Sequence, residues 1–419
     1  MDWKHLRELE FSDLPLDKED RSILNTLAEK LQNNYPYHDV NYAGQMIKPP
    51  HILSQAAYWM SSYVNPNNHA LDGGRATSEL EIEVIKSVAS MFGWTSSLGH
   101  LTSGGTMGNL EALWVARQAN PDTVVFASKS SHYTHHRMSE VLNIPFQEIR
   151  TDISGRMDVQ YLQKQLINAK TPPVVVVTMG TTGLGKVDPL AEILQLREHY
   201  EFRIHVDAAY GGYFGLCRLP SPTAIHYDSL MHVDSIVIDP HKHGLQPYGC
   251  GAVLFKNPAE GKYYKHESPY TYFTSTDLHL GEITLECSRA GSSAAALWAT
   301  MQKFPLQKTG IFASRLEESL KAANGFHKTA QKMGFWSIKP ELDICVFSLK
   351  AKNSSEISRL NREFFERKAT NNIHLALLKL SKENCPWNLN WEQEELVVIR
   401  SVLMKPEHND PSFWSKALK

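Results

Sequence analysis

The sequence lacks the segments that would place a protein in a membrane or in an oxidising compartment. No apolar run among the 419 residues approaches the ~20 needed to span a bilayer, and the first ten residues are polar and charged where a secretion signal needs an apolar core. The five cysteines stand singly without a C-x-x-C pair, and their odd number argues against a complete disulfide framework. These absences predict a cytoplasmic protein.

An excess of either charge is also missing. The 43 Lys and Arg residues nearly balance the 45 Asp and Glu residues, giving a formal charge of -2, and there is no long basic run. We therefore expect no nucleic-acid or membrane-surface partner. The 42% hydrophobic content is enough for a large core, and the length suits one large domain with a smaller one.

Changes in pattern predict an N-terminal arm and two domains. Residues 1–70 are polar with patchy helical spacing, and we expect an arm that packs on another surface. Residues 71–310 alternate helical patterns with short β-branched runs, which is typical of a mostly parallel α/β sheet buried on both faces. Residues 311–419 predict a small α+β domain. Strands are expected at 123–127, 174–178, 202–206, 235–238 and 252–255 in the large domain, and at 344–349, 375–380 and 396–403 in the small one.

Three segments have the spacing of amphipathic helices. The first begins at Thr77, where Thr77-Ser78-Glu79 resembles an N-terminal cap followed by acidic first-turn residues. The second is a continuous pattern over residues 294–320, and the third lies near residues 356–368.

A lysine between two histidines follows the predicted strand at 235–238. In Pro240-His241-Lys242-His243, Lys242 is held at the rim of a core, where loss of water and neighbouring positive charge favour its neutral form. A neutral amine there can form a Schiff base with a carbonyl compound. In isolation, the same motif is more often a solvated loop.

A carboxylate followed by very small residues ends the predicted strand at 202–206. Asp207 could pair with the nitrogen of a heteroaromatic ring and keep it protonated, while Ala209 leaves room for one face of that ring. The alternative is that Asp207 caps a helix and the small residues serve close packing.

Two further turns carry groups suited to a phosphate. Ser103-Gly104-Gly105-Thr106 opens a helix, so its backbone N–H groups and hydroxyl can bind a phosphate without a lysine, and no P-loop pattern is present. Gly180-Thr181-Thr182 follows the strand at 174–178, and Thr182 could contact a phosphate or a ring oxygen.

A histidine-rich segment follows the strand at 123–127. His132 could stack on a cofactor ring. Together with His135 and His136 it suggests a metal site, but the Glu of H-E-x-x-H and partner ligands at suitable spacing are missing, so we expect no metal.

All these motifs follow strand-like runs, and ligands of open α/β sheets gather at the carboxyl ends of strands. The ordered set extends over about residues 65–405 and includes Asn65-Pro66-Asn67-Asn68 and a late segment at 285–291. It resembles the fold-type-I pyridoxal-phosphate enzymes, specifically the group II amino-acid decarboxylase family, which includes glutamate and aromatic amino-acid decarboxylases.

The resemblance implies a role for each matching residue. Lys242 would hold pyridoxal 5'-phosphate as an internal aldimine, Asp207 would pair with the ring nitrogen, and His132 would stack on the ring. Ala209 would contact the opposite face. The remaining cofactor contacts would come from Gly105, Thr106, Thr182, His241 and Asp239, the last where relatives often carry Asn or Ser.

The resemblance also suggests catalytic and substrate contacts. Tyr270 or Tyr272 occupies the stretch where relatives carry a mobile-loop tyrosine linked to protonation of the α-carbon. Arg400 resembles a strand arginine that meets a substrate carboxylate, although Met404-Lys405-Pro406 replaces the usual Asn-Pro after that strand and a structural salt bridge is an equal alternative. Arg289 could close the phosphate site of a neighbouring subunit.

The implied assembly is a homodimer with active sites at the subunit interface, and the arm could wrap the partner. The expected function is that of a pyridoxal-phosphate-dependent carboxy-lyase in amino-acid metabolism, which releases CO2 and an amine from an L-amino acid.

Three other functions are compatible with parts of the pattern. A carbon–carbon lyase similar to sphingosine-phosphate lyase shares the fold, and its two carbonyl-containing products would distinguish it. A non-catalytic protein that kept the fold is disfavoured by the intact set of Lys242, Asp207 and His132. A metal-dependent hydrolase would use the histidine cluster, and its activity would not survive chelation.

Overall fold

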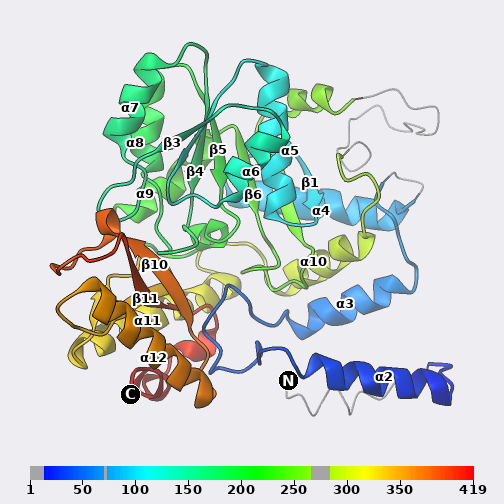
Figure 1. Ribbon diagram of the computed structural model, residues 1–419. Coiled ribbons are helices and arrows are strands. Elements are labelled where there is room, and N and C mark those ends of the chain that lie inside the picture. The colour runs from blue at the N-terminus through cyan, green and yellow to red at the C-terminus, as the bar shows by residue number, and fades with distance from the viewer. Residues whose placement is uncertain (1–13, 70–72, 266–283) are drawn as a thin grey trace.

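The computed structural model describes residues 14–69, 73–265 and 284–419, which form two sheets with helices packed around them (Figure 1). The predicted catalytic residues Tyr270 and Tyr272 lie outside these described residues. Within the described ranges, no helix is both long and apolar enough to cross a membrane.

The larger sheet has seven strands in the order β1-β7-β6-β5-β4-β2-β3. The pairs from β6 through β5, β4 and β2 to β3 are parallel, and β7 is antiparallel to both of its neighbours. This arrangement confirms the expected α/β class with a mostly parallel sheet. The strands are β1 Leu98–Thr102, β2 Val125–Ser128, β3 Phe146–Ile149, β4 Val174–Thr178, β5 Arg203–Asp207, β6 Ser235–Ile238 and β7 Gly251–Phe255.

Helices cover both faces of this sheet because side chains alternate along each strand. On β7, Val253 and Phe255 pack in one cluster with residues of α5 (Gly105–Ala119), whereas Ala252 and Leu254 pack in another with residues of α4 (Arg75–Met91). The other helices of this part are α6 Thr134–Val141, α7 Val159–Asn168, α8 Leu190–Gln195, α9 Thr223–Asp228 and α10 Gly291–Lys303, with short 3-10 turns at η1 Leu196–Glu198, η2 Gly212–Leu216, η3 Ser229–His232 and η4 Pro258–Tyr263.

Two details of the predicted helices are wrong. Helix α4 begins at Arg75 rather than at a Thr77 cap, because the Thr77 hydroxyl lies inside the helix and donates to Asn68 Oδ1 at 2.6 Å. The pattern over residues 294–320 contains two helices, α10 and α11 (Ile311–Lys332), rather than one. Pro305 lies between them and has no N–H to continue the helical hydrogen bonds.

The smaller sheet is antiparallel, in the order β10-β11-β9-β8. Helix α11 packs against β8 and β9, and α12 packs against β10 and β11. This confirms a small C-terminal α+β unit, and the three predicted strands are present within one or two residues. The elements are β8 Trp336–Ile338, β9 Ile344–Ser348, α12 Ser354–Thr370, β10 Ala376–Ser381, η6 Lys382–Asn384, β11 Glu395–Val402, η7 Pro406–His408 and α13 Pro411–Leu418.

The two N-terminal helices differ in how they are covered. Helix α3 (Ile52–Ser62) packs against α10, whereas α2 (Lys18–Leu31) extends along the lower edge of the molecule beyond α3 (Figure 1). Two apolar residues of α2, Ile23 and Leu27, are 59% and 47% exposed. Helix α2 therefore presents an apolar stripe that the described part of the chain leaves largely uncovered.

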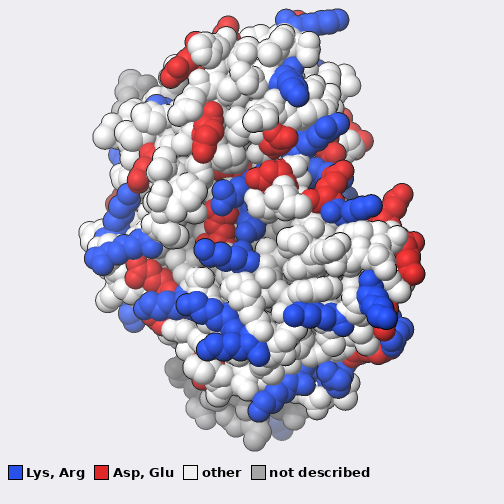
Figure 2. Space-filling view, turned by 90° about the vertical axis from the view of Figure 1, so that its left-hand side faces the viewer, with Lys and Arg blue, Asp and Glu red and all other residues white. Residues whose placement is uncertain are grey.

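Charge is unevenly distributed on the face shown in Figure 2. Acidic and basic side chains lie together in the upper part, whereas Lys and Arg gather in the lower part, on the side of the smaller sheet.

A buried ion pair fixes the end of β1. Arg289 Nη1 donates to Glu81 Oε1 at 2.6 Å and to the Leu101 carbonyl at 2.8 Å, and Glu81 Oε1 also accepts the Leu101 N–H at 2.9 Å. Burial alone would raise the pKa of Glu81, but the Arg289 guanidinium holds that pKa below its ordinary value. The arginine thus holds the strand that leads into the Ser103 turn, and its expected place at a neighbouring subunit's phosphate site stays a prediction.

We expect Arg289→Gln to lower the free energy of unfolding by about 3–5 kcal/mol, because it leaves the buried Glu81 carboxylate without its charged partner. Urea unfolding of the cofactor-free protein measures this loss. The control is Lys308→Ala, which removes an ion pair to Asp228 whose side chains are 68% and 66% exposed and should cost below about 1 kcal/mol. Equal losses in the two variants would contradict the assignment.

Candidate active site

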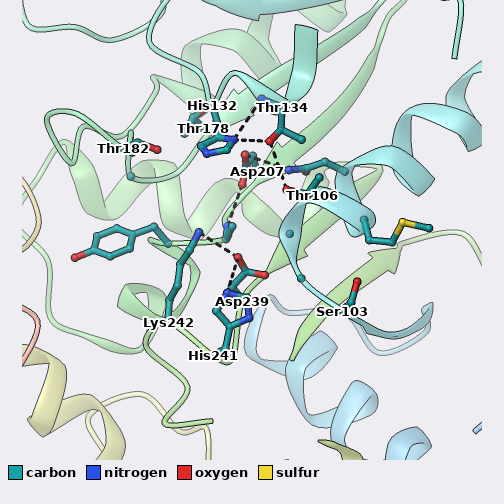
Figure 3. A pocket seen from close by; sticks show the side chains of 17 residues that line it. Ser103, Thr106, His132, Thr134, Thr178, Thr182, Asp207, Asp239, His241 and Lys242 are labelled. Carbon is teal, nitrogen blue, oxygen red and sulfur yellow. Dashed lines mark hydrogen bonds and ion pairs between the residues drawn. The ribbon is translucent and has the colours of Figure 1, made fainter. Parts of the chain in front are cut away.

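A cavity of about 310 Å³ opens where the strands of the larger sheet end. Strands β2, β4, β5 and β6 run parallel, so the loops that leave them meet at one edge of the sheet. All nine residues predicted to bind the cofactor lie in its wall (Figure 3). It is lined by Ser103, Gly104, Gly105, Thr106, Met107, Asn109, His132, Thr134, Thr178, Gly180, Thr182, Asp207, Ala209, Tyr210, Asp239, His241 and Lys242.

Asp207 ends β5 and brings a buried negative charge to this cavity. Its Oδ2 lies 2.9 Å from His135 Nε2 and accepts the Asn109 side-chain amide at 3.3 Å, and its Oδ1 accepts the Ala209 N–H at 3.1 Å. Burial alone would raise the pKa of Asp207, but the hydrogen bond from His135 and the charge of Lys242 hold that pKa well below its ordinary value. The carboxylate is therefore ionised.

A chain of hydrogen bonds sets the orientation of Asn109. His205 Nε2 lies 2.8 Å from Asn109 Oδ1, and His205 Nδ1 lies 2.9 Å from the Ser235 hydroxyl. Burial lowers the pKa of His205 to about 3, so its ring is neutral. Because Asn109 donates its amide to Asp207, its oxygen accepts the His205 N–H, and His205 Nδ1 accepts the Ser235 hydroxyl.

Lys242 faces a carboxylate instead of the positive charge expected from its flanking histidines. Its Nζ lies 3.1 Å from Asp239 Oδ2, and His241 Nε2 lies 3.5 Å from the same oxygen. Burial lowers the pKa values of His241 and His243, and the His243 ring is turned toward Asp343. The negative charge of Asp239 attracts the Lys242 amine and would repel a phosphate placed next to it.

The beginning of α5 offers a cradle of backbone N–H groups. Gly104 has a φ of 157°, which only glycine adopts without strain, and Gly105 opens the helix. A Cβ added at Gly105 would lie 2.9 Å from Asp239 Oδ2. The exposed Thr106 hydroxyl lies 3.5 Å from that of Thr134. The close approach requires glycine at position 105, and the free helix N-terminus with the hydroxyls suits a phosphate group.

His132 forms another wall of the cavity. Its Nδ1 lies 2.5 Å from the Thr134 hydroxyl and accepts the Thr134 N–H at 3.3 Å, which fixes the plane of the ring. Burial lowers the pKa of His132, so a neutral ring faces the cavity. Such a ring can lie flat against an aromatic ligand.

Tyr210 connects the cavity to the smaller sheet. Its hydroxyl donates to Asp343 Oδ1 at 2.5 Å, and Asp343 Oδ2 lies 3.3 Å from His243 Nε2. Burial raises the pKa of Tyr210 far above its ordinary value, which keeps the hydroxyl protonated. The wall of the cavity at Tyr210 is thus fixed from both sheets.

Arg400 is the one predicted site residue of the described ranges that does not line the cavity. It lies on β11 and is 5% exposed, and its Nη1 is 3.5 Å from the Gly44 carbonyl. Among the described residues its Nε and Nη2 have no hydrogen-bond partner and no carboxylate forms an ion pair with it. It interacts electrostatically with Tyr210 and Asp343.

Several residues of the site were not predicted. Asn109 contacts Asp207 from the second turn of α5, His135 contacts it from the first turn of α6, and Thr134 positions His132. The only sequence signal for His135 was its membership of a histidine cluster, which suggested a metal. Within the described ranges, no group of three or more His, Cys, Asp or Glu side chains is arranged to hold a metal ion.

The chain matches a known family over most of its length. A sequence profile described as the pyridoxal-dependent decarboxylase conserved domain matches residues 35–350. An L-tyrosine decarboxylase of Enterococcus faecium is 27% identical, over 94% of this chain and 87% of that protein. A probable L-tyrosine/L-aspartate decarboxylase of Methanothermobacter thermautotrophicus is 30% identical, over 75% of this chain and 85% of the relative.

Solved structures share the fold. The crystal structure of mouse CSAD in apo form superposes with a TM-score of 0.82 at 21% identity, covering 99% of this chain and 91% of that one. Oryza sativa TDC with PLP and tryptamine superposes with a TM-score of 0.81 at 17% identity, covering 100% and 92%. The chain belongs to the pyridoxal-dependent decarboxylase family and is a pyridoxal-phosphate-dependent amino-acid decarboxylase with a fold-type-I architecture.

Proposed function

We propose that the cavity holds pyridoxal phosphate between Lys242 and Asp207. The observation that carries this proposal is an ionised, buried carboxylate that borders the same cavity as a lysine side chain, as Figure 3 shows. Lys242 would hold the cofactor covalently, and Asp207 would pair with the protonated ring nitrogen. The N–H groups at Gly105, the Thr106 hydroxyl and His241 would bind the phosphate, and Asp239 would border the cofactor at Lys242, whose Nζ lies 3.1 Å from Asp239 Oδ2.

In the reaction, the bond between the α-carbon and the carboxylate breaks, CO2 leaves and a proton takes its place. The bound cofactor supplies an electron sink for the pair of electrons left on the α-carbon. Asp207 would keep the ring nitrogen protonated, and His132 and Ala209 would confine the ring from two sides. Thr182 would contact the oxygen side of the ring. The assignment of the proton donor to Tyr270 or Tyr272 stays a prediction, since both lie outside the described residues.

Lys242→Ala should abolish the covalent attachment of the cofactor, because no other amine lines the cavity within the described ranges. The measurement is the visible absorption spectrum with added pyridoxal phosphate, followed by borohydride reduction and peptide mapping. We expect a stable adduct on Lys242 in the wild type and a loss of turnover of at least a thousandfold in the variant, of the order seen when a covalent catalyst is removed.

Lys256→Ala is the matched control, since Lys256 follows the adjacent strand β7 and is exposed. It should retain the spectrum and the turnover of the wild type. An adduct on a different residue, or normal turnover of Lys242→Ala, would contradict the proposal.

We further propose L-tyrosine as the substrate, supported by the name of the relative that covers 94% of this chain. L-aspartate is the second candidate. Other relatives carry both amino acids in their names. Within the described ranges, Nε and Nη2 of the buried Arg400 have no hydrogen-bond partner, and their N–H groups suit a carboxylate.

A substrate assay together with the variant Arg400→Met tests which of the two amino acids is the substrate. Purified enzyme is incubated with each amino acid, and CO2 and the product amine are quantified. If L-aspartate is turned over, the variant should raise its KM about tenfold through loss of a charge-assisted hydrogen bond, whereas the control Lys379→Met, at an exposed pair on the same sheet, should not. Formation of two carbonyl-containing fragments in place of CO2 would instead indicate a carbon–carbon lyase.

We propose that the protein is a homodimer in which residues 1–70 are an arm on the partner, with the large domain at 71–310 and the small domain at 311–419. The support is the apolar stripe of α2 together with exposed apolar side chains on α3 and at its C-terminal end. The exposed fractions lie between 37% and 68% for Ile23, Leu27, Leu31, Ile52, Trp59, Met60 and Tyr63. A second copy of the chain, which carries the same apolar surface, is the occupant we assign to it.

The double substitution Ile23→Glu/Leu27→Glu should convert the dimer to a monomer, because it places two charges in the apolar contact. Sedimentation velocity gives the mass of the particle directly. The control Ile167→Glu changes a side chain on α7 that is 61% exposed and should leave the dimer intact. A wild-type protein that sediments as a monomer would contradict the arm assignment.

A cytoplasmic location is proposed on the chemistry of the cysteines. All five are free thiols, and three of them are buried, so nothing in the chain depends on an oxidising compartment. Fractionation of cells that express the protein tests this location.

A further inference from the structure

A second buried histidine contacts the carboxylate at the centre of the site. His135 lies on the first turn of α6 and is 0% exposed, and its Nε2 is 2.9 Å from Asp207 Oδ2. Its Nδ1 has no hydrogen-bond partner among the described residues. The adjacent His136 side chain is 60% exposed, and its ring packs edge-on against Phe146 of β3 with the ring centroids 5.0 Å apart. The two histidines therefore have different surroundings although they are neighbours in sequence.

The direction of the hydrogen bond follows from the chemistry of its two groups. An ionised carboxylate can only accept, so His135 Nε2 carries the proton and donates it to Asp207. The other donors to Asp207 are the Asn109 amide at 3.3 Å and the Ala209 N–H at 3.1 Å. The His135 bond is the shortest of the three and comes from the one titratable side chain among these donors.

Burial opposes the charge that Asp207 carries. A carboxylate removed from water favours its neutral, protonated form unless donors compensate for the lost hydration. Asp207 is 5% exposed. A protonated Asp207 could not form an ion pair with a protonated ring nitrogen, so the donors around it decide whether the pairing exists.

We propose that His135 is a positioning residue for the decarboxylation: its hydrogen bond orients Asp207 toward the cofactor ring nitrogen and keeps this carboxylate charged. The inference rests on the proposed pairing of Asp207 with that nitrogen. His135 itself acts from outside the cavity wall and reaches the reacting atoms only through Asp207.

Cofactor binding to the cofactor-free protein tests this role. His135→Phe fills the same space without a donor, and we expect the dissociation constant of pyridoxal phosphate to rise about tenfold, as for the loss of one hydrogen bond to a charged group. His135→Gln places an amide N–H near the position of Nε2 and should restore binding to within about threefold of the wild type. His136→Phe is the matched control and should bind as the wild type does.

A cofactor analogue with C–H in place of the ring nitrogen separates this role from a merely structural one. The analogue has no charge to offer Asp207, so wild type and His135→Phe should bind it with equal affinity. The proposal would be overturned if His135→Phe lost affinity for the cofactor and for the analogue by the same factor. It would also be overturned if a folded His135→Phe protein bound the natural cofactor as tightly as the wild type does.

A measurement on the wild type keeps the proposal testable if His135→Phe does not fold. In protein labelled with 15N-histidine, the His135 Nε2–H signal should shift on binding of pyridoxal phosphate and stay within the line width on binding of the analogue. Equal shifts with both ligands would overturn the inference. Failure of the proposed function is distinct: it would show as the absence of a borohydride-stable adduct on Lys242 in the wild type.

Discussion

The structure of the site depends on one buried negative charge at the end of β5. A carboxylate that is 5% exposed would give up its charge unless its surroundings supplied donors, and the chain supplies three N–H groups from three different segments. Each donor must itself be held in place. The hydrogen bonds from Ser235 through His205 fix the side chain of Asn109, and the first turn of α6 fixes the position of His135.

Helix α5 links the two ends of the cavity. Its first residue, Gly105, offers the backbone N–H groups suited to an anion, and Asn109, about one turn later, contacts Asp207. A helical turn rises about 5.4 Å, so the spacing between the anion cradle and the buried carboxylate is set by helix geometry instead of by a flexible loop. The Glu81–Arg289 pair holds the end of β1, the strand that leads into this helix. Because Glu81 lies on α4, the position of α5 also depends on α4.

The features predicted best from the sequence are those set by burial alone, such as strands covered on both faces of the sheet. Strands β4 and β6 match the expected ranges because their apolar β-branched runs suit only a strand buried on both faces. Strands β1 and β3 were not predicted, because β1 contains Gly99 and His100 and β3 is an edge strand with two polar residues. The buried His100 is compatible with β1 only because its ring lies 2.8 Å from Glu111 of α5, a partner that no local pattern indicates.

The same limit applies to the site. The nine residues predicted to bind the cofactor all lie in the cavity wall, since the loops that follow parallel strands converge at one edge of the sheet. The contacts of Asn109 and His135 with Asp207 were not predicted, because helical spacing shows which face is buried but not which buried polar atoms meet. Lys242 was expected to have positively charged neighbours. Folding instead turns His243 toward Asp343 and brings the Asp239 carboxylate to the lysine.

The hydrogen bond between Tyr210 and Asp343 has a consequence for selectivity. The tyrosine belongs to the cavity wall and the aspartate to the smaller sheet, and their 2.5 Å contact is buried together with His243. Moving one sheet against the other would strand these groups without partners, at a cost of about 1–3 kcal/mol for each buried polar group. An amino acid that fits beside Tyr210 without displacing it is therefore favoured over one that would have to break this buried hydrogen bond.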